Sequence, residues 1–192
     1  ILSLEERMTI CNMSIEAGAR AGMFAPDGKT FNYLIDKPMS PKGLAWDQAV
    51  EKWSTLVSDD NCEFDKEVDI DVDQLSPMIT YGTNPGMAIQ IDDIVPESNS
   101  DLGYKKSLNY MQIEAGRPLL GKEIDVVFIG SCTNSRISDL EDAAEILQGQ
   151  KVANGIRALI VPGSQAVKKE AESLGLDKIF ESAGAEWRES GC

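Results

Sequence analysis

The pattern of apolar and polar positions divides the chain into segments of different character. Residues 4–21 carry apolar side chains at spacings that predict a helix, and residues 46–57 place alanine, valine, leucine and tryptophan on one face of a second helix. Residues 64–72 instead alternate valine and isoleucine with acidic residues, which predicts a strand with one acidic face. The polar run 96–101 is rich in turn residues, and we interpret it as a linker.

After the linker, helical and strand patterns alternate regularly. The predicted elements are helices over residues 102–115, 138–147 and 165–174, and strands over residues 124–129 and 157–161. This order is typical of a three-layer α/β domain whose sheet is at least partly parallel, because parallel strands need crossover helices. We therefore expect parts of two α/β domains, residues 1–96 and residues 97–192.

The composition excludes several classes of partner. The 192 residues carry 32 acidic and 18 basic side chains, which gives a formal net charge of −14. Such a surface repels phosphate backbones and anionic lipids, so we expect neither a nucleic acid nor a membrane as partner. No apolar stretch approaches the roughly 18 residues of a membrane span. The first residues lack the layout of an export signal, so we expect a cytoplasmic protein.

The chain contains no histidine, which removes catalytic arrangements that need an imidazole. Its cysteines are Cys11, Cys62, Cys132 and Cys192. They are too sparse for a disulfide framework, so we expect free or metal-bound thiols. Cys132 follows a predicted strand and precedes a predicted helix, a place where ligands gather in α/β sheets and where a thiolate is favoured. The alternative interpretation of such a lone cysteine is a small buried hydrophobic residue.

Several separated motifs resemble the aconitase family, in the same order along the chain. The run Gly130-Ser131-Cys132-Thr133-Asn134-Ser135 is similar to the first cluster-ligand motif of that family, and Gly191-Cys192 resembles the opening of its second motif, Gly-Cys-x-x-Cys. The two cysteines are sixty residues apart, a separation similar to that in the isopropylmalate isomerases of the family. Residues 8–19, 81–86 and 184–188 are also similar to segments of these enzymes.

The resemblance implies an aconitase-like α/β/α fold and hydro-lyase chemistry on a [4Fe–4S] cluster. It implies the interconversion of 2-isopropylmalate and 3-isopropylmalate by dehydration and rehydration, a step of leucine biosynthesis. In such a site three cysteines hold three irons, and the remaining iron is free to act as a Lewis acid. By resemblance, Cys132 and Cys192 are two of the ligands and Asn134 lies beside them. Cys11 and Cys62 do not fall on ligand positions, and we expect both to be buried structural thiols.

By the same resemblance, Asn12 and Glu16 correspond to positions beside the cluster and the substrate. An amide there can donate to a cluster sulfur, and a carboxylate can hold an oxygen at the iron. In the predicted helix the two residues stand at i and i+4, hence on one face. Taken from the residues alone, Glu16 is a solvated helix acid.

The sequence also departs from the family pattern. A third cysteine ligand belongs two residues after Cys192, and the family's histidines lie upstream of Ile1. In the two-subunit members, a separate small subunit supplies a catalytic serine and a substrate-binding arginine. We therefore expect an internal portion of a larger subunit, inactive by itself and unable to hold an intact cluster. The alternatives are an aconitase or homoaconitase, and, in another class, a non-enzymatic α/β interaction module with incidental cysteines.

Overall fold

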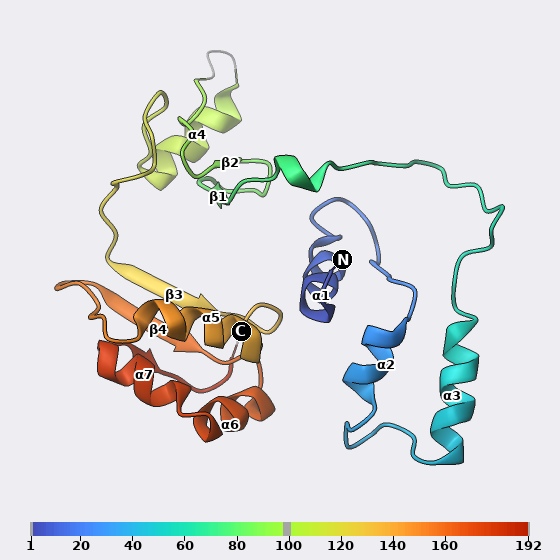
Figure 1. Ribbon diagram of the computed structural model, residues 1–192. Helices are drawn as coiled ribbons and strands as arrows, with labels where there is room; N and C mark the ends of the chain where they lie inside the picture. Colours follow the sequence, from blue (N-terminus) through green and yellow to red (C-terminus); the bar gives the residue numbers. More distant parts are fainter. Residues whose placement is uncertain (1, 98–100, 192) are drawn as a thin grey trace. The chain divides into compact units, whose positions relative to one another are not determined.

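The structure of the protein, a computed structural model, describes residues 2–97 and 101–191 (Figure 1). Cys192 and part of the predicted linker 96–101 lie outside these ranges. The chain divides into two units: the first combines the residues up to Cys62 with those from Ile124 onward, and the second is Glu63–Glu123. The predicted domains 1–96 and 97–192 have other bounds, and that division stays a prediction. No helix in the described ranges is long and apolar enough to cross a membrane.

The first unit contains a parallel three-stranded sheet. Its strands, in sheet order, are β3 (Val126–Gly130), β4 (Arg157–Val161) and β5 (Glu186–Trp187). The helices between them are α5 (Ile137–Leu147), α6 (Gln165–Ser173) and α7 (Leu176–Ala183). Strand, crossover helix and parallel strand follow one another as the sequence pattern predicted. The α/β class and the partly parallel sheet are therefore confirmed.

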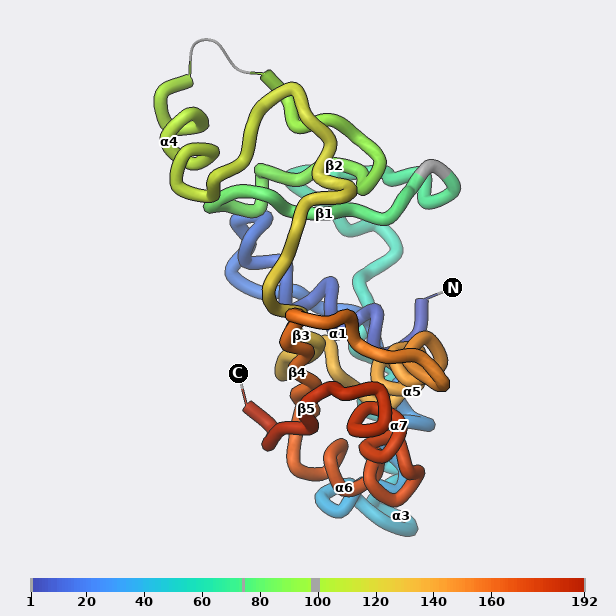
Figure 2. The backbone as a smooth tube through the Cα atoms, turned by 90° about the vertical axis from the view of Figure 1, so that its left-hand side faces the viewer, coloured from blue at the N-terminus to red at the C-terminus, as the bar shows by residue number. Residues whose placement is uncertain are grey.

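These helices bury their apolar sides against one face of the sheet. Leu140 of α5 and Phe180 of α7 are both 0% exposed and belong to the same core cluster as Ala158 and Ile160 of β4. Ala158 and Ile160 are two residues apart on the strand, so both point to the helical face. Figure 2 shows the three helices together on one side of the strands. On the opposite face Phe128 is 56% exposed, so the third layer of the predicted fold stays a prediction.

The helices of the chain's first part are α1 (Leu4–Met13), α2 (Gly28–Leu34) and α3 (Leu44–Ser54). Ser3 starts α1 through a capping box: its hydroxyl accepts from the Glu6 N–H, and the Glu6 carboxylate accepts from the Ser3 N–H. The predicted helix 4–21 is too long, because α1 ends at Met13. The Ser14 hydroxyl donates to the Cys11 carbonyl at 2.8 Å, a local bond that competes with helix continuation.

The second unit contains the 3-10 helix η1 (Val72–Gln74), the antiparallel strands β1 (Met78–Thr80) and β2 (Ala88–Gln90), and α4 (Leu102–Met111). Its core consists of Tyr81, Met87, Ile89, Val95 and Leu108. The predicted strand 64–72 is wrong, because the described residues 64–71 form no strand and Val68 and Ile70 remain about two-thirds exposed, at 69% and 67%. Alternation alone does not make a strand, which needs hydrogen-bonded neighbours and a face to pack on.

A pH-dependent ion pair joins α1 to α2, and it yields a test of this packing. Arg7 is buried and donates to the Asp27 carboxylate at 2.7 Å, which lowers the pKa of Asp27 from 3.8 to about 2. Because the folded-state pKa is depressed, the stability from this pair is present above about pH 4 and is lost as the pH falls toward 2. Asp27→Asn keeps the oxygen that caps α2 but removes the charge.

We expect the unmodified chain to exceed Asp27→Asn in free energy of unfolding at neutral pH. The difference between the two should close between about pH 4 and pH 2. Urea unfolding of both proteins at a series of pH values measures it. If the difference in free energy of unfolding between the two proteins does not vary with pH, the stabilising ion pair between Arg7 and Asp27 is refuted.

Candidate functional site

Cys132 lies in a loop directly after the carboxyl end of β3. Ser131 shapes this loop, because its hydroxyl accepts from the backbone N–H groups of Thr133, at 3.3 Å, and Asn134, at 3.0 Å. The Cys132 thiol is exposed and lies 3.9 Å from the Thr133 hydroxyl. The loop thus presents a thiol at the strand end and leads into α5 five residues later.

Two glycines let the Cys132 loop approach β4 closely. Gly130 has a φ of +149°, and a Cβ built there would lie 2.3 Å from the carbonyl oxygen of Val161. Gly163, just after β4, donates its N–H to the Ser135 carbonyl at 3.0 Å. A Cβ on Gly163 would lie 2.9 Å from that oxygen and 3.2 Å from the Ser131 carbonyl. Only glycine fits such a close backbone approach without displacing its neighbours.

The same loop holds buried polar atoms that lack partners. Ser135 is 0% exposed, and among the described residues its hydroxyl has no hydrogen-bond partner. The same is true of the Nε atom of Arg136. Buried polar atoms in proteins nearly always bind protein, water or a ligand. These two atoms and the exposed thiol fit a loop that is completed by a further bound group.

Helix α1 reaches the Cys132 loop. The side-chain amide of Asn134 donates to the Thr9 hydroxyl at 2.9 Å. Asn12 lies three residues beyond Thr9, so the two are neighbours on the surface of α1. Glu16 lies beyond the helix, in a turn where its N–H donates to the Met13 carbonyl at 3.2 Å. The prediction that Asn12 and Glu16 share one helix face is therefore wrong, although both are exposed on the same short stretch.

Strand β5 carries the chain toward Cys192, which itself lies outside the described residues. The N–H of Arg188 donates to the Ile160 carbonyl at 3.0 Å and so extends the pairing with β4 past Trp187. Because the three strands are parallel, the carboxyl ends of β3 and β5 lie at the same edge of the sheet, with only β4 between them. Strands are spaced by about 4.8 Å, so these two ends are about 10 Å apart.

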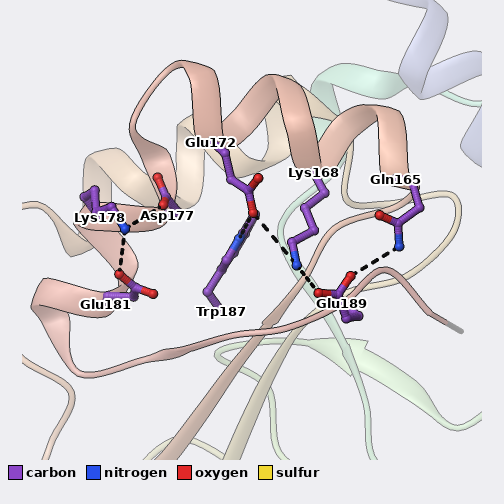
Figure 3. A network of polar contacts seen from close by, with 8 residues as sticks. All are labelled: Gln165, Lys168, Glu172, Asp177, Lys178, Glu181, Trp187 and Glu189. Atoms are coloured by element: carbon purple, nitrogen blue, oxygen red, sulfur yellow. Dashed lines mark hydrogen bonds and ion pairs between the residues drawn. The ribbon is translucent and has the colours of Figure 1, made fainter.

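Side chains of α6 bind the segment that follows β5 (Figure 3). Lys168 forms an ion pair with Glu189 and lies 3.8 Å from Glu172. Gln165 donates to the other carboxylate oxygen of Glu189 at 3.3 Å, and the Trp187 indole donates to Glu172 at 3.0 Å. The hydrogen bond from Lys168 lowers the pKa of Glu189, which favours its charged form. Trp187 and Glu189 are thus fixed to α6 by charged and hydrogen-bonded side chains.

The other two cysteines lie elsewhere. Cys62 is exposed, so the expectation that it is a buried thiol is wrong; its neighbours Asp59, Asp60, Asn61 and Glu63 offer no apolar surface to cover it. Cys11 is partly exposed, so it is not fully buried either. Within residues 2–97 and 101–191, no three cysteine, aspartate or glutamate side chains come together in a way that could hold a metal ion.

Comparison with known proteins identifies the family. The sequence matches the aconitase family (aconitate hydratase) over residues 1–192. The chain belongs to the aconitase family. This membership confirms the predicted resemblance and agrees with the α/β fold.

Curated members of the aconitase family include close relatives of the whole chain. It is 58% identical to the 3-isopropylmalate dehydratase large subunit of Roseiflexus castenholzii (strain DSM 13941 / HLO8) over 197 aligned residues, which cover 100% of this chain and 42% of that protein. Proteins of the same name from Solibacter usitatus (strain Ellin6076) and Corynebacterium glutamicum (strain R) are 55% and 53% identical over the whole chain. The chain spans 41–42% of the length of these relatives.

Sequence reasoning gave no role of their own to three residues that shape the site: Thr9, Ser131 and Gly163. The sequence offers a local signal for Ser131, because a serine hydroxyl can accept from the backbone N–H groups two or three residues later and so stabilise a turn. Gly163 carries a weaker one, since a glycine between a strand and a helix often marks a close backbone approach. Thr9 carries none, because its partner Asn134 is 125 positions away in the sequence.

The Gly130 geometry yields a test on stability. Gly155 also has a positive φ, +87°, but a Cβ there would meet nothing within 4 Å. We expect Gly155→Ala to cost about 1–2 kcal/mol from backbone strain. Gly130→Ala should cost a further 1–3 kcal/mol, roughly, because its Cβ also clashes with β4. Urea unfolding of the two variants measures the difference, and equal costs refute the close approach.

Proposed function

We propose that the chain is part of the large subunit of a 3-isopropylmalate dehydratase, which interconverts 2-isopropylmalate and 3-isopropylmalate in leucine biosynthesis. The observation that carries the proposal is the parallel order β3-β4-β5, because the strand before Cys132 and the strand before Cys192 then end on the same side of one sheet, with only β4 between them. The names of three relatives at 53–58% identity support the choice of substrate over citrate or homocitrate.

In the complete subunit, Cys132 and Cys192 would hold a [4Fe–4S] cluster together with a third cysteine from outside this chain. Thiolates are the ordinary ligands of such clusters, and the exposed Cys132 thiol beside the unpartnered Ser135 hydroxyl fits that role. When bound, the cluster supplies a Lewis-acidic iron for the substrate's hydroxyl and carboxylate. The proposed role of Cys192 as a ligand rests on its position in the sequence alone.

The proposed roles of Asn12 and Glu16 follow from their place on α1 and on the turn after it. A carboxylate is a group that can hold or move a proton, and Glu16 carries one on this exposed stretch. We assign that role to Glu16, and we assign to Asn12 the orientation of the bound groups through its amide. The bond between Thr9 and Asn134 supports both roles, because it joins α1 to the Cys132 loop. Asn134 thus acts as a positioning residue for α1.

The partner in this proposal is the small subunit of the same enzyme, in the cytoplasm. It would contribute the serine and the arginine that complete the active site. The 192 residues alone would then be inactive, because they lack those groups and the third thiol.

Iron binding tests the assignment of the ligands. After anaerobic reconstitution, we expect the complete subunit to bind iron at cluster stoichiometry, and Cys132→Ser and Cys192→Ser each to abolish it. Cys62→Ser is the matched control, because that thiol is also exposed but is not a proposed ligand. Iron analysis and visible absorbance measure the outcome. Retention of the cluster in Cys132→Ser, or an intact cluster on the 192-residue chain alone, refutes the assignment.

Turnover of the complete two-subunit enzyme tests Glu16 and the substrate. We expect Glu16→Gln to lower kcat by about 10²–10⁴, the usual contribution of acid–base catalysis. Glu51→Gln on α3, also an exposed acid, should leave kcat unchanged. The assay runs 2-isopropylmalate, homocitrate and citrate side by side. Preference for citrate contradicts the proposed substrate, and full activity of Glu16→Gln contradicts its role.

A further inference from the structure

The outer edge of β3 is the side of that strand that faces away from β4, and no other strand of the described residues pairs with it. The sheet order is β3-β4-β5, so β4 has a neighbour on each side whereas β3 has one neighbour only. The sequence of β3 is Val-Val-Phe-Ile-Gly, without a polar side chain. Such a continuous apolar run is typical of an inner strand of a parallel sheet, covered on both faces. The sequence of β3 is thus that of an inner strand, although the strand lies at the edge.

Apolar surface borders the outer edge of β3 on both faces of the sheet. On the face away from the helices, Val126 is 52% exposed and Phe128 is 56% exposed. On the helical face, a cavity of about 360 Å³ lies beside α5, and the residues that line it are all apolar, with Ile124 and Ile146 among them. An apolar strand edge that is open to solvent is a template for pairing with a further strand, and native proteins cover such edges.

We propose that a further strand, from the part of the subunit outside these 192 residues, pairs with the outer edge of β3. The chain covers 42% of the Roseiflexus castenholzii relative, so more than half of such a subunit is available to supply this strand. The three strands of this sheet are parallel, and the apolar run of β3 fits a parallel neighbour on its other side as well. The inference rests on the proposed function only in taking the chain as part of a longer subunit.

The handedness of crossover connections explains why one face of the sheet is open. Helices α5, α6 and α7 lie on one face because the chain passes from β3 to β4 to β5 through right-handed crossovers (Figure 2). Parallel strands added outward from β3 follow one another in the opposite direction, so right-handed crossovers place their helices on the other face. That is the face on which Val126 and Phe128 are exposed. One added segment of strand and helix therefore covers both the edge and the open face.

The Cys132 loop follows the carboxyl end of β3, where the completed sheet would reverse its strand order. The chain leaves β3 toward β4 on one side, and the added strands continue on the other side. In open α/β sheets, ligands bind in the crevice outside the carboxyl ends of the strands at such a reversal. The added strand thus gives a reason why a ligand would bind beside the exposed thiol of Cys132 and not at another strand end.

Hydrogen exchange of the β3 amides, measured by mass spectrometry with single-residue resolution, tests the pairing. In a parallel strand, alternate residues direct their N–H groups to opposite sides. In the complete subunit, we expect every N–H group of β3 to exchange as slowly as those of β4, which has a strand on each side. In the 192-residue chain, alternate N–H groups of β3 should exchange about tenfold faster than those of β4, or more, because they lack an acceptor.

A substitution on the open face tests whether the added segment covers it. We expect Phe128→Ser to lower the Tm of the complete subunit by about 5 °C, because a buried aromatic side chain is lost. The same substitution should leave the Tm of the 192-residue chain unchanged, because Phe128 is 56% exposed there. Leu174→Ser is the matched control: Leu174 is 55% exposed but lies at the end of α6, and its replacement should leave both proteins unchanged.

Fast exchange at alternate β3 amides of the complete subunit overturns the inference, as does an equal Tm of its Phe128→Ser and Leu174→Ser variants. Protection of β3 that the complete subunit gains only with the small subunit, or only on dimerisation, assigns the edge to a separate chain and overturns it as well. None of these measurements depends on iron or turnover. A negative result here therefore leaves the proposed function to its own tests, and loss of the cluster would leave β3 protected.

Discussion

The parallel pairing of β3, β4 and β5 is the constraint on which the candidate site depends. Parallel strands end at the same edge, so whatever follows each strand is delivered to one side of the sheet. Here the Cys132 loop follows β3, the Gly163 turn follows β4, and residues 188–191 follow β5. The first and the last of these segments are about sixty positions apart in the sequence. All three lie at one edge because the crossover helices return the chain to the same starting end of the sheet.

Helix α6 combines two tasks on its two sides. Its apolar side places Val167 and Ala171 in the core beneath β4, where Ala171 is 0% exposed. Lys168 follows Val167 in the sequence but lies on the polar side of the helix, where it forms an ion pair with Glu189. The burial that fixes the helix on the sheet therefore also fixes the group that holds Glu189. The glycines after β3 and β4 complete this arrangement by permitting backbone contact where side chains would separate the loops.

Local patterns predicted the elements whose partners lie close in the sequence. The strand 157–161 coincides with β4, and the helices 138–147 and 165–174 differ from α5 and α6 by one residue. The helix 4–21 and the strand 64–72 failed because Ser14 redirects the backbone and because the alternating segment has no described strand beside it. Cys132 was found from its place at a strand end, whereas Cys192, Asn12 and Glu16 needed the family resemblance. The contact of Thr9 with Asn134 joins residues that are far apart in the sequence, so a single sequence does not predict it.

The central claim of the proposed function is that Cys132 and Cys192 bind the same iron group. Anomalous diffraction at the iron absorption edge, on crystals of the complete subunit, tests it most directly. The account predicts iron atoms about 2.3 Å from the Sγ atoms of both Cys132 and Cys192. Iron held by other residues, with either thiol directed away from it, would contradict the account and leave only the α/β fold.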